Sequence, residues 1–215
     1  MKPVSETYNI DCIQGMKEYP DNYFQLAIVD PPYGGNDAIG IKSSDNCKNH
    51  ATKRKEYKLF NNKPPSIDYF LELKRVSVNQ IIWGVNFYKD FDLTGGRIVW
   101  DKKGTAFGRA EMAYYSNSKS VSIYEYTWNG MLQQDMKNKE IRIHPTQKPV
   151  KLYEWLLSNY AKEGDKILDT HLGSGSSRIA AYNLGFHFVG MELDKEYFDA
   201  QEKRFKEITA QQVLF

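Results

Sequence analysis

The chain has 215 residues, is 41% hydrophobic and carries a formal net charge of +2, which together suit one ordinary globular domain over residues 1–215. Its two cysteines, Cys12 and Cys47, fit no metal-ligand pattern and no disulfide framework, so no metal site is expected. No apolar stretch approaches the length of a membrane span and the polar start lacks the apolar centre of a signal peptide, so we expect a cytoplasmic protein without membrane contact.

The first informative segment is an apolar run that ends at two prolines. A strand is expected over about residues 7–12, and residues 24–29 predict a buried strand because the run is short and β-branched at its end. This strand delivers Asp30-Pro31-Pro32-Tyr33 to its carboxyl edge, where ligands bind in open α/β sheets.

The tetrapeptide itself suggests what binds there. Pro31 and Pro32 have no N–H group, so the turn presents the Asp30 carboxylate and backbone carbonyls, which are all acceptors and suit a donor amine. The Tyr33 ring offers a flat surface on which an aromatic ring can stack. The alternative is a strand that merely ends at prolines, with Tyr33 as a core aromatic residue.

Residues 34–65 contain many Gly, Asn, Ser and Lys residues and few large apolar ones, which indicates a long mobile basic loop. Because the loop begins beside Tyr33, we expect it to contact phosphate groups, and a solvated surface loop is the alternative. The expected contact residues are Lys53, Arg54, Lys55 and Lys58.

The middle of the chain continues with a helix and several strands. Ser66 caps a predicted helix, and residues 80–83 predict the next strand. Further strands are expected at 97–100, 111–115 and 121–128, where they could form hairpins within a β-rich target-recognition insertion over 97–143. After His144-Pro145-Thr146-Gln147-Lys148, Pro149 opens another helix.

The last third of the chain repeats the alternation of strand and helix. Residues 166–168 predict a strand, Asp169-Thr170-His171-Leu172-Gly173-Ser174-Gly175 a glycine turn, and residues 176–184 a capped helix that ends at Gly185. A strand over 188–191 and a helix over about 194–208 follow. Such alternation implies a mostly parallel sheet that is covered on both faces.

The glycine turn and a later acid predict a ligand. Gly173 and Gly175 let the backbone approach a ligand and enter a helix whose amino end favours a carboxylate, and Glu192 can bind both hydroxyls of a ribose. Together they describe a nucleoside with an anionic tail. The alternative is a turn that only packs a strand on a helix, and the P-loop lysine and the third dinucleotide glycine are both missing.

These motifs resemble those of the amino-group DNA methyltransferases. The segment 30–33 is similar to their catalytic motif, 169–175 to their cofactor motif, and 144–149 to the lead-in that precedes it. The order, with catalysis first, is that of the family's β group. The resemblance spans almost the whole chain, because it also includes Trp83-Gly84-Val85-Asn86, Val99-Trp100-Asp101-Lys102 and Glu111-Met112-Ala113.

The resemblance implies a Rossmann-like S-adenosylmethionine-dependent methyltransferase fold: a mostly parallel sheet, helices on both faces and a small β-rich insertion. It implies methyl transfer to the exocyclic N6 amine of adenine in DNA, after the base is flipped out of the duplex. The implied catalytic residues are Asp30, Pro31, Pro32 and Tyr33. The implied cofactor residues are Asp11, Asp30, Thr146, Lys148, Asp169, Thr170, His171, Gly173, Ser174, Gly175 and Glu192, with Asp11 flanking the adenine and Thr146 and Lys148 near the methionine end.

Thr170 and His171 replace the family's usual Pro-Phe, and we expect His171 to stack or hydrogen-bond locally. The chain is short for the group, so target recognition is expected from residues 34–143, with short or relaxed specificity. Cytosine N4 or another amine is the alternative target, although Asp at position 30 favours adenine. A second alternative is a non-catalytic DNA-binding subunit.

The end of the chain carries one further pattern. Gln211, Leu214 and Phe215 resemble the short peptide by which bacterial DNA enzymes dock on the replication sliding clamp, and folding back on the domain is the alternative. The family resemblance also implies a possible homodimer and a role in restriction and modification.

Overall fold

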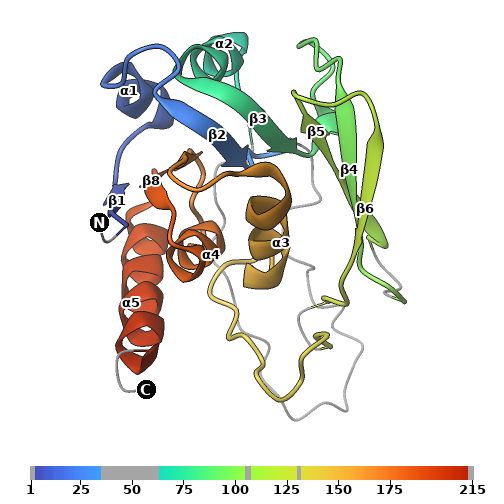
Figure 1. Ribbon diagram of the computed structural model, residues 1–215, viewed down its shortest axis with the longest axis vertical. Helices are drawn as coiled ribbons and strands as arrows, with labels where there is room; N and C mark the ends of the chain where they lie inside the picture. The colour runs from blue at the N-terminus through green and yellow to red at the C-terminus, as the bar shows by residue number, and fades with distance from the viewer. Residues whose placement is uncertain (1–2, 35–62, 105–107, 130–131, 213–215) are drawn as a thin grey trace, which may run out of the picture.

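We analysed a computed structural model that describes residues 3–34, 63–104, 108–129 and 132–212. Within these residues, the chain forms one mixed sheet and five α-helices (Figure 1). The strands are β1 (Ser5–Tyr8), β2 (Phe24–Val29), β3 (Ser77–Trp83), β4 (Gly96–Asp101), β5 (Ala110–Tyr115), β6 (Val121–Glu125), β7 (Lys166–Asp169) and β8 (His187–Met191). The helices are α1 (Cys12–Lys17), α2 (Ile67–Val76), α3 (Val150–Tyr160), α4 (Ser176–Leu184) and α5 (Lys195–Gln212), and a short 3-10 helix, η2 (Val85–Phe87), follows β3.

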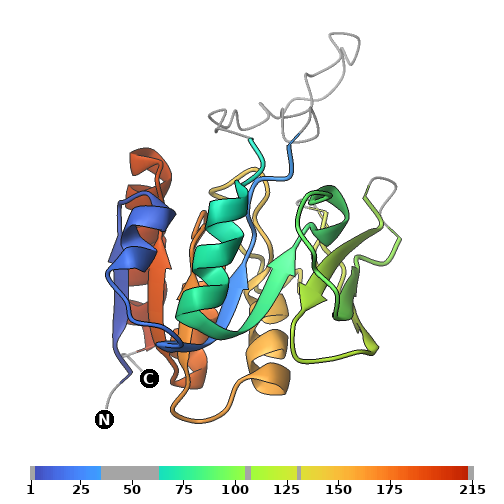
Figure 2. The ribbon, with the colours of Figure 1, turned by 90° about the horizontal axis from the view of Figure 1, so that it is seen from above.

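The strand order across the sheet is β1-β8-β7-β2-β3-β5-β4-β6. From β1 to β3 all neighbours are parallel, whereas β5 runs antiparallel to both β3 and β4. The strands β4, β5 and β6 form the edge of the sheet farthest from β1 (Figure 2). Because β8, β7, β2 and β3 are parallel neighbours, the residues that follow them meet at one edge of the sheet.

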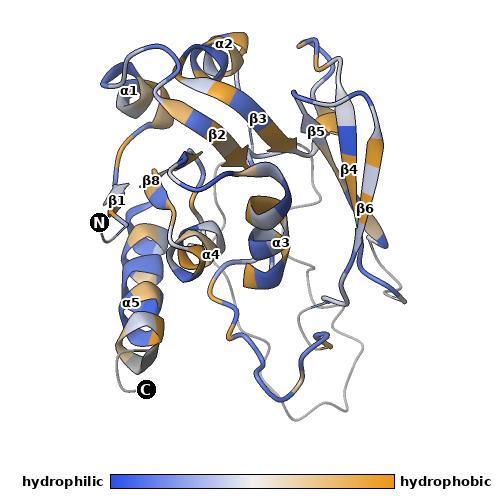
Figure 3. Cartoon of the chain, viewed as in Figure 1, coloured by the Kyte–Doolittle hydropathy of each residue, from blue (hydrophilic) through white to orange (hydrophobic). Residues whose placement is uncertain are grey.

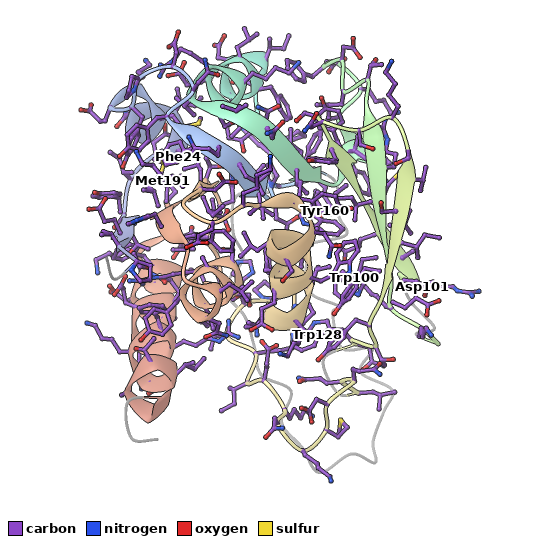
Figure 4. The ribbon with its side chains drawn as sticks, viewed as in Figure 1. Phe24, Trp100, Asp101, Trp128, Tyr160 and Met191 are labelled. Atoms are coloured by element: carbon purple, nitrogen blue, oxygen red, sulfur yellow. The ribbon has the colours of Figure 1, made fainter. Side chains whose placement is uncertain are left out.

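Two hydrophobic cores cover the two faces of the sheet. One contains Phe24 from β2 and Leu73 from α2, together with Met16 from α1 and Met191 from β8. The other core lies against α3 and α4, and there Trp100, Trp128 and Tyr160 fill the space between α3 and β4 (Figure 4). Most of β2 and the carboxyl half of β3 are hydrophobic in Figure 3, as expected for strands that are buried on both faces.

The fold prediction is confirmed: the sheet is mostly parallel and helices cover both faces. The predicted cap Ser66 is the N-cap of α2, and its hydroxyl accepts a hydrogen bond from the backbone N–H of Tyr69. Pro149, which was predicted to open a helix, is the residue immediately before α3. The predicted hairpin exists between β4 and β5, while β6 pairs with β4 in parallel. The predicted strand over 121–128 is too long, because β6 ends at Glu125.

The first predicted strand is wrong at its end. It stops at Tyr8, and the chain turns into α1, a helix that the sequence did not predict. The cause is Asp11, whose carboxylate accepts hydrogen bonds from the backbone N–H groups of Ile13 and Gln14 and so caps α1. The helix is short and buries only Gly15 and Met16, so its sequence shows no helical repeat of apolar residues.

Candidate active site

Three acidic residues mark the carboxyl edge of the sheet. Asp30 follows β2, Asp169 ends β7 and Glu192 follows β8. Since β7 pairs with both β2 and β8, the sheet brings the predicted catalytic and cofactor motifs together, although Asp169 comes 139 positions after Asp30 in the sequence. The predicted juxtaposition at the carboxyl edge is therefore present.

Both oxygens of the Asp30 carboxylate accept hydrogen bonds. The Tyr33 hydroxyl donates to Oδ1 at 2.6 Å, and the Lys148 ammonium donates to Oδ2 at 2.5 Å. The Lys148 side chain is only 3% exposed, and although burial alone would lower its pKa, the charges of Asp30 and Glu111 raise it. The ammonium is therefore charged at neutral pH, and the orientation of the carboxylate is fixed from both sides.

The Tyr33 ring lies between neighbours that shape its position. It stacks on Phe87 with a centroid distance of 4.9 Å and an interplanar angle of 9°. Gly84 has a φ of +75°, and a Cβ at this position would lie 2.2 Å from Cε1 of Tyr33, so only glycine leaves room for the ring. Burial, together with the Asp30 and Glu111 carboxylates, raises the Tyr33 pKa, which keeps its hydroxyl protonated as the donor to Asp30.

The backbone carbonyl of Pro31 is engaged as well. The Tyr88 hydroxyl donates a hydrogen bond to it at 2.8 Å, and the Tyr88 ring meets Tyr33 edge-on with centroids 6.4 Å apart. A carbonyl oxygen has two lone pairs, so one remains for a further donor. The sequence did not single out Tyr88 because nothing in its local pattern indicates this long-range contact.

Glu111 on β5 was also not predicted as a site residue. Its Oε2 atom lies 3.0 Å from the Lys148 Nζ atom, and its Oε1 accepts a short hydrogen bond from Lys102. Burial alone would raise the pKa of Glu111, but these two ammonium groups lower it to about 2. Lys148, which the family resemblance assigned to the methionine end of a cofactor, thus binds two carboxylates here.

The predicted glycine turn is anchored to Glu192. Gly173 and Gly175 have left-handed φ values of 50° and 71°. The backbone N–H of Gly173 donates to Oε2 of Glu192 at 2.8 Å, while Oε1 accepts from the N–H of Asp194 at 2.9 Å. Burial raises the pKa of Glu192. This acid is therefore in place beside the turn, as the spacing of the two motifs indicated.

Asp169 has a role within the turn. It is 2% exposed and accepts hydrogen bonds from the Ser177 hydroxyl at 2.5 Å and from the backbone N–H of His171 at 3.0 Å. Burial raises its pKa to about 7. The Asp169 carboxylate thus links the glycine turn to the first residues of α4 through the backbone N–H of His171 and the hydroxyl of Ser177.

His171 and Thr170 interact locally, as expected from the sequence. The Thr170 hydroxyl forms hydrogen bonds with the Tyr69 hydroxyl at 2.7 Å and with Nδ1 of His171 at 3.0 Å. The His171 ring contacts the Tyr69 ring edge-on with centroids 5.3 Å apart. Burial lowers the pKa of His171 to about 4, so its imidazole is neutral at pH 7.

The lead-in to α3 brings His144, another residue that we did not predict, to the glycine turn. Its ring would lie 3.7 Å from a Cβ built on Gly173, and it meets Tyr197 edge-on with centroids 4.3 Å apart. Thr146 is exposed and its hydroxyl lies 3.1 Å from Nδ1 of His144. The only sequence signal for His144 was its place at the head of the lead-in motif.

The remaining predicted residues divide into two groups. Asp11 caps α1, and the Ser174 hydroxyl forms a hydrogen bond with the Ser176 hydroxyl at 3.0 Å. The basic residues Lys53, Arg54, Lys55 and Lys58, and the tail residues Leu214 and Phe215, lie outside the described residues, while Gln211 belongs to the last turn of α5. Within the described part of the chain, no cluster of acidic, His and Cys residues could bind a metal ion, and no helix is long and apolar enough to cross a membrane.

Comparison with known proteins identifies the family. A family model described as DNA methylase matches residues 40–203, which is most of the chain, and the protein therefore belongs to the amino-group DNA methyltransferases. Among curated relatives, Type II methyltransferase M2.DpnII of Streptococcus pneumoniae is 40% identical over 79 residues, which are 37% of this chain and 29% of that protein. Type II methyltransferase M2.LlaDCHI of Lactococcus lactis subsp. cremoris is 34% identical over 112 residues, which are 50% of this chain and 40% of that protein. The matched segments thus span less than half of either relative.

Solved structures share the fold at low sequence identity. The M1.HpyAVI–SAM complex superposes with a TM-score of 0.55 at 20% identity, covering 94% of this chain and 100% of that one. The cytosine-N4-specific PvuII DNA methyltransferase superposes with a TM-score of 0.59 at 15% identity, covering 95% of this chain and 89% of that one. At these identities the likeness establishes the fold alone.

Proposed function

We propose that the protein transfers a methyl group from S-adenosylmethionine to the exocyclic N6 amine of adenine in DNA. The observation that carries the proposal is Asp30, a carboxylate fixed at the carboxyl edge of the sheet by Tyr33 and Lys148, with the Pro31 carbonyl next to it. Carboxylate and carbonyl oxygens accept hydrogen bonds, and the two N–H groups of an exocyclic amine donate them.

The residues at the glycine turn fit a nucleoside cofactor with an anionic tail. Gly173 and Gly175 adopt left-handed conformations in the turn that leads into α4, and Glu192 lies hydrogen-bonded to the same turn. These residues would bind the amino acid and ribose parts, with His144 beside the turn. When bound, S-adenosylmethionine supplies an electrophilic methyl group on its sulfonium.

The chain's own residues would activate the amine by position. The lone pair of an exocyclic amine is delocalised into the base, so the nitrogen is a poor nucleophile until its N–H groups are aligned. The Asp30 carboxylate and the Pro31 carbonyl would each accept a hydrogen bond from one of these N–H groups. After methylation, the Asp30 carboxylate would take the proton that leaves the nitrogen. Tyr33 would provide the ring on which the flipped base stacks.

The choice of adenine rests on Asp rather than Ser at position 30, a feature of the motif resemblance. Contact with DNA is proposed for the basic residues Lys53, Arg54, Lys55 and Lys58, whose segment follows directly on the Tyr33 motif. A homodimer and docking on a sliding clamp through Gln211, Leu214 and Phe215 stay predictions.

The test is methylation of mixed-sequence DNA with labelled S-adenosylmethionine, followed by digestion to nucleosides and identification of the methylated base by mass. We expect N6-methyladenine. N4-methylcytosine would overturn the choice of adenine, and no methylated base in the presence of bound DNA would support a non-catalytic subunit. Asp30→Ala should lose at least about a hundredfold in rate with cofactor affinity within several-fold. Asp21→Ala is the matched control, because Asp21 is 73% exposed and pairs with Arg75 away from the site.

A further inference from the structure

Four charged side chains form a continuous row that begins at the catalytic carboxylate. Asp30 contacts Lys148, Lys148 contacts Glu111, and Glu111 contacts Lys102. The exposed fractions of these side chains are 15%, 3%, 25% and 16% in the same order. The row links the end of β2 to the β4–β5 hairpin, with Lys148 as its most buried member.

The row contains two carboxylates and two ammonium groups. Lys148 lies between the two carboxylates, with Nζ 2.5 Å from Asp30 and 3.0 Å from Glu111, and Lys102 contacts the other oxygen of Glu111. Asp30 alone would pair Lys148 and Lys102 alone would pair Glu111, so the contact between Glu111 and Lys148 requires an explanation.

The proposed reaction supplies one. A neutral amine that accepts a methyl group from a sulfonium becomes positively charged in the transition state. A carboxylate beside the nitrogen stabilises this charge, whereas an ammonium paired with the same carboxylate cancels much of its effect. Lys148 therefore orients Asp30 but also opposes the charge that the site must stabilise.

We propose that Glu111 is a positioning residue that shares Lys148 with Asp30 and thereby leaves the negative charge of Asp30 available to the amine as it becomes cationic. The inference rests on the proposed methyl transfer. Glu111 acts through Lys148 and does not need to touch the substrate. Its effect is electrostatic, and it therefore extends to any cation that is bound at the reacting position.

The first test is the single-turnover rate of methyl transfer at saturating DNA and cofactor. Glu111→Gln keeps the size of the side chain and leaves one carboxylate with two ammonium groups, so we expect a rate loss of at least about tenfold. Glu111→Asp, which keeps the charge, should retain most of the rate. Glu72→Gln is the matched control, since Glu72 is a partly buried carboxylate paired with Arg75 on α2, and it should change the rate less than about twofold.

A double-mutant cycle tests whether Glu111 acts through Lys148. In the Lys148→Met background, Glu111→Gln should lower the rate much less than in the unaltered protein, because the ammonium that Glu111 offsets is gone. If the rate losses of the two single variants multiply in the double variant, the inference is overturned. It is also overturned if Glu111→Gln alone keeps the rate of the unaltered protein.

The second test measures binding without turnover. Sinefungin carries a cationic amine in place of the sulfonium methyl group, and S-adenosylhomocysteine is neutral there, so the ratio of their affinities by calorimetry reports the charge of the site. Glu111→Gln should lower the preference for sinefungin at least about fivefold. Lys102→Met removes a cation from the row and should raise the preference for sinefungin over S-adenosylhomocysteine. This variant tests the inference even if Glu111→Gln fails to fold.

The two tests separate the inference from the proposed function. If the unaltered protein binds neither analogue, the proposed cofactor is wrong and the inference falls with it. If the protein binds both analogues but the affinity ratio is the same in the unaltered, Glu111→Gln and Lys102→Met proteins, the inference alone is overturned.

Discussion

Gly84→Ala is the sharpest test of how the backbone shapes the catalytic motif. Gly84 follows β3 at a φ of +75°, and a Cβ built there would lie 2.2 Å from Cε1 and 2.4 Å from Cδ1 of Tyr33. Ordinary carbon contacts begin at about 3.5 Å, so the ring would have to move by roughly 1.3 Å. The substitution therefore displaces Tyr33 without altering any functional group.

This displacement has two separable costs. A non-glycine residue in the left-handed region costs roughly 1–2 kcal/mol of stability. The ring movement would also break the hydrogen bond of 2.6 Å from the Tyr33 hydroxyl to Asp30, because such a bond does not extend beyond about 3.0 Å. A misplacement of about 1 Å can lower a rate about a hundredfold, and we expect a loss of that order.

Gly185→Ala separates the backbone cost from the effect on Tyr33. Gly185 has a φ of +76° at the end of α4, and a Cβ there would meet no atom within 4 Å. Thermal unfolding of Gly185→Ala should show the backbone cost alone and Gly84→Ala a larger loss of stability, whereas only Gly84→Ala should lose methyl transfer in a single-turnover assay. Equal rates in the two variants would refute the role assigned to the Tyr33 position.

Three other expectations follow from the contacts. Tyr33→Phe keeps the ring but loses the bond to Asp30 and should slow single-turnover transfer about tenfold, whereas Tyr33→Ala should lose at least tenfold more; equal losses would exclude a role for the ring. Because the His171 pKa is lowered to about 4, the unfolded chain binds the extra proton below the ordinary histidine pKa, and stability should fall as the pH drops from 6.5 towards 4. His171→Phe should remove up to about 2 kcal/mol of the difference between pH 7 and pH 5 in denaturant unfolding, and an unchanged difference would contradict this. Arg204→Met should cost roughly 3–5 kcal/mol in the same assay because it removes the guanidinium that pairs with Oε2 of the partly buried Glu140. Adding Glu140→Met should recover part of this loss, and purely additive losses in the double variant would contradict the expectation.

The arrangement of the sheet edge was predictable from local patterns. Each relevant strand is a short apolar run with a polar residue at its end, and parallel strands place those ends together. The strand boundaries therefore placed Asp30 and Glu192 at this edge, and the glycine pattern placed the turn of Gly173 beside them. Helix caps such as Ser66 were equally visible, because a cap is a contact between residues that are three positions apart.

The partners of the site were not predictable in this way. Lys148 and Asp30 are 118 positions apart, and Lys148 and Glu111 come from different elements of the fold. Glu111 lies in a segment that resembles the family, Glu111-Met112-Ala113, but the resemblance gave its side chain no role. Only the antiparallel pairing of β5 with β3 brings its carboxylate to the carboxyl edge of the parallel strands.

The acidic residues also show why a residue type alone does not define a role. The family resemblance assigns both Asp11 and Asp169 to a cofactor, and each also has a structural role: Oδ1 of Asp11 accepts from two amide groups of α1, and the oxygens of Asp169 accept from Ser177 and the amide of His171. Asp30, in contrast, is bound by two side chains within the described residues, Tyr33 and Lys148. Side chains can adjust when a substrate enters more readily than backbone amides in a helix or turn. The carboxylate whose described partners are both side chains is therefore the one best suited to receive an amine.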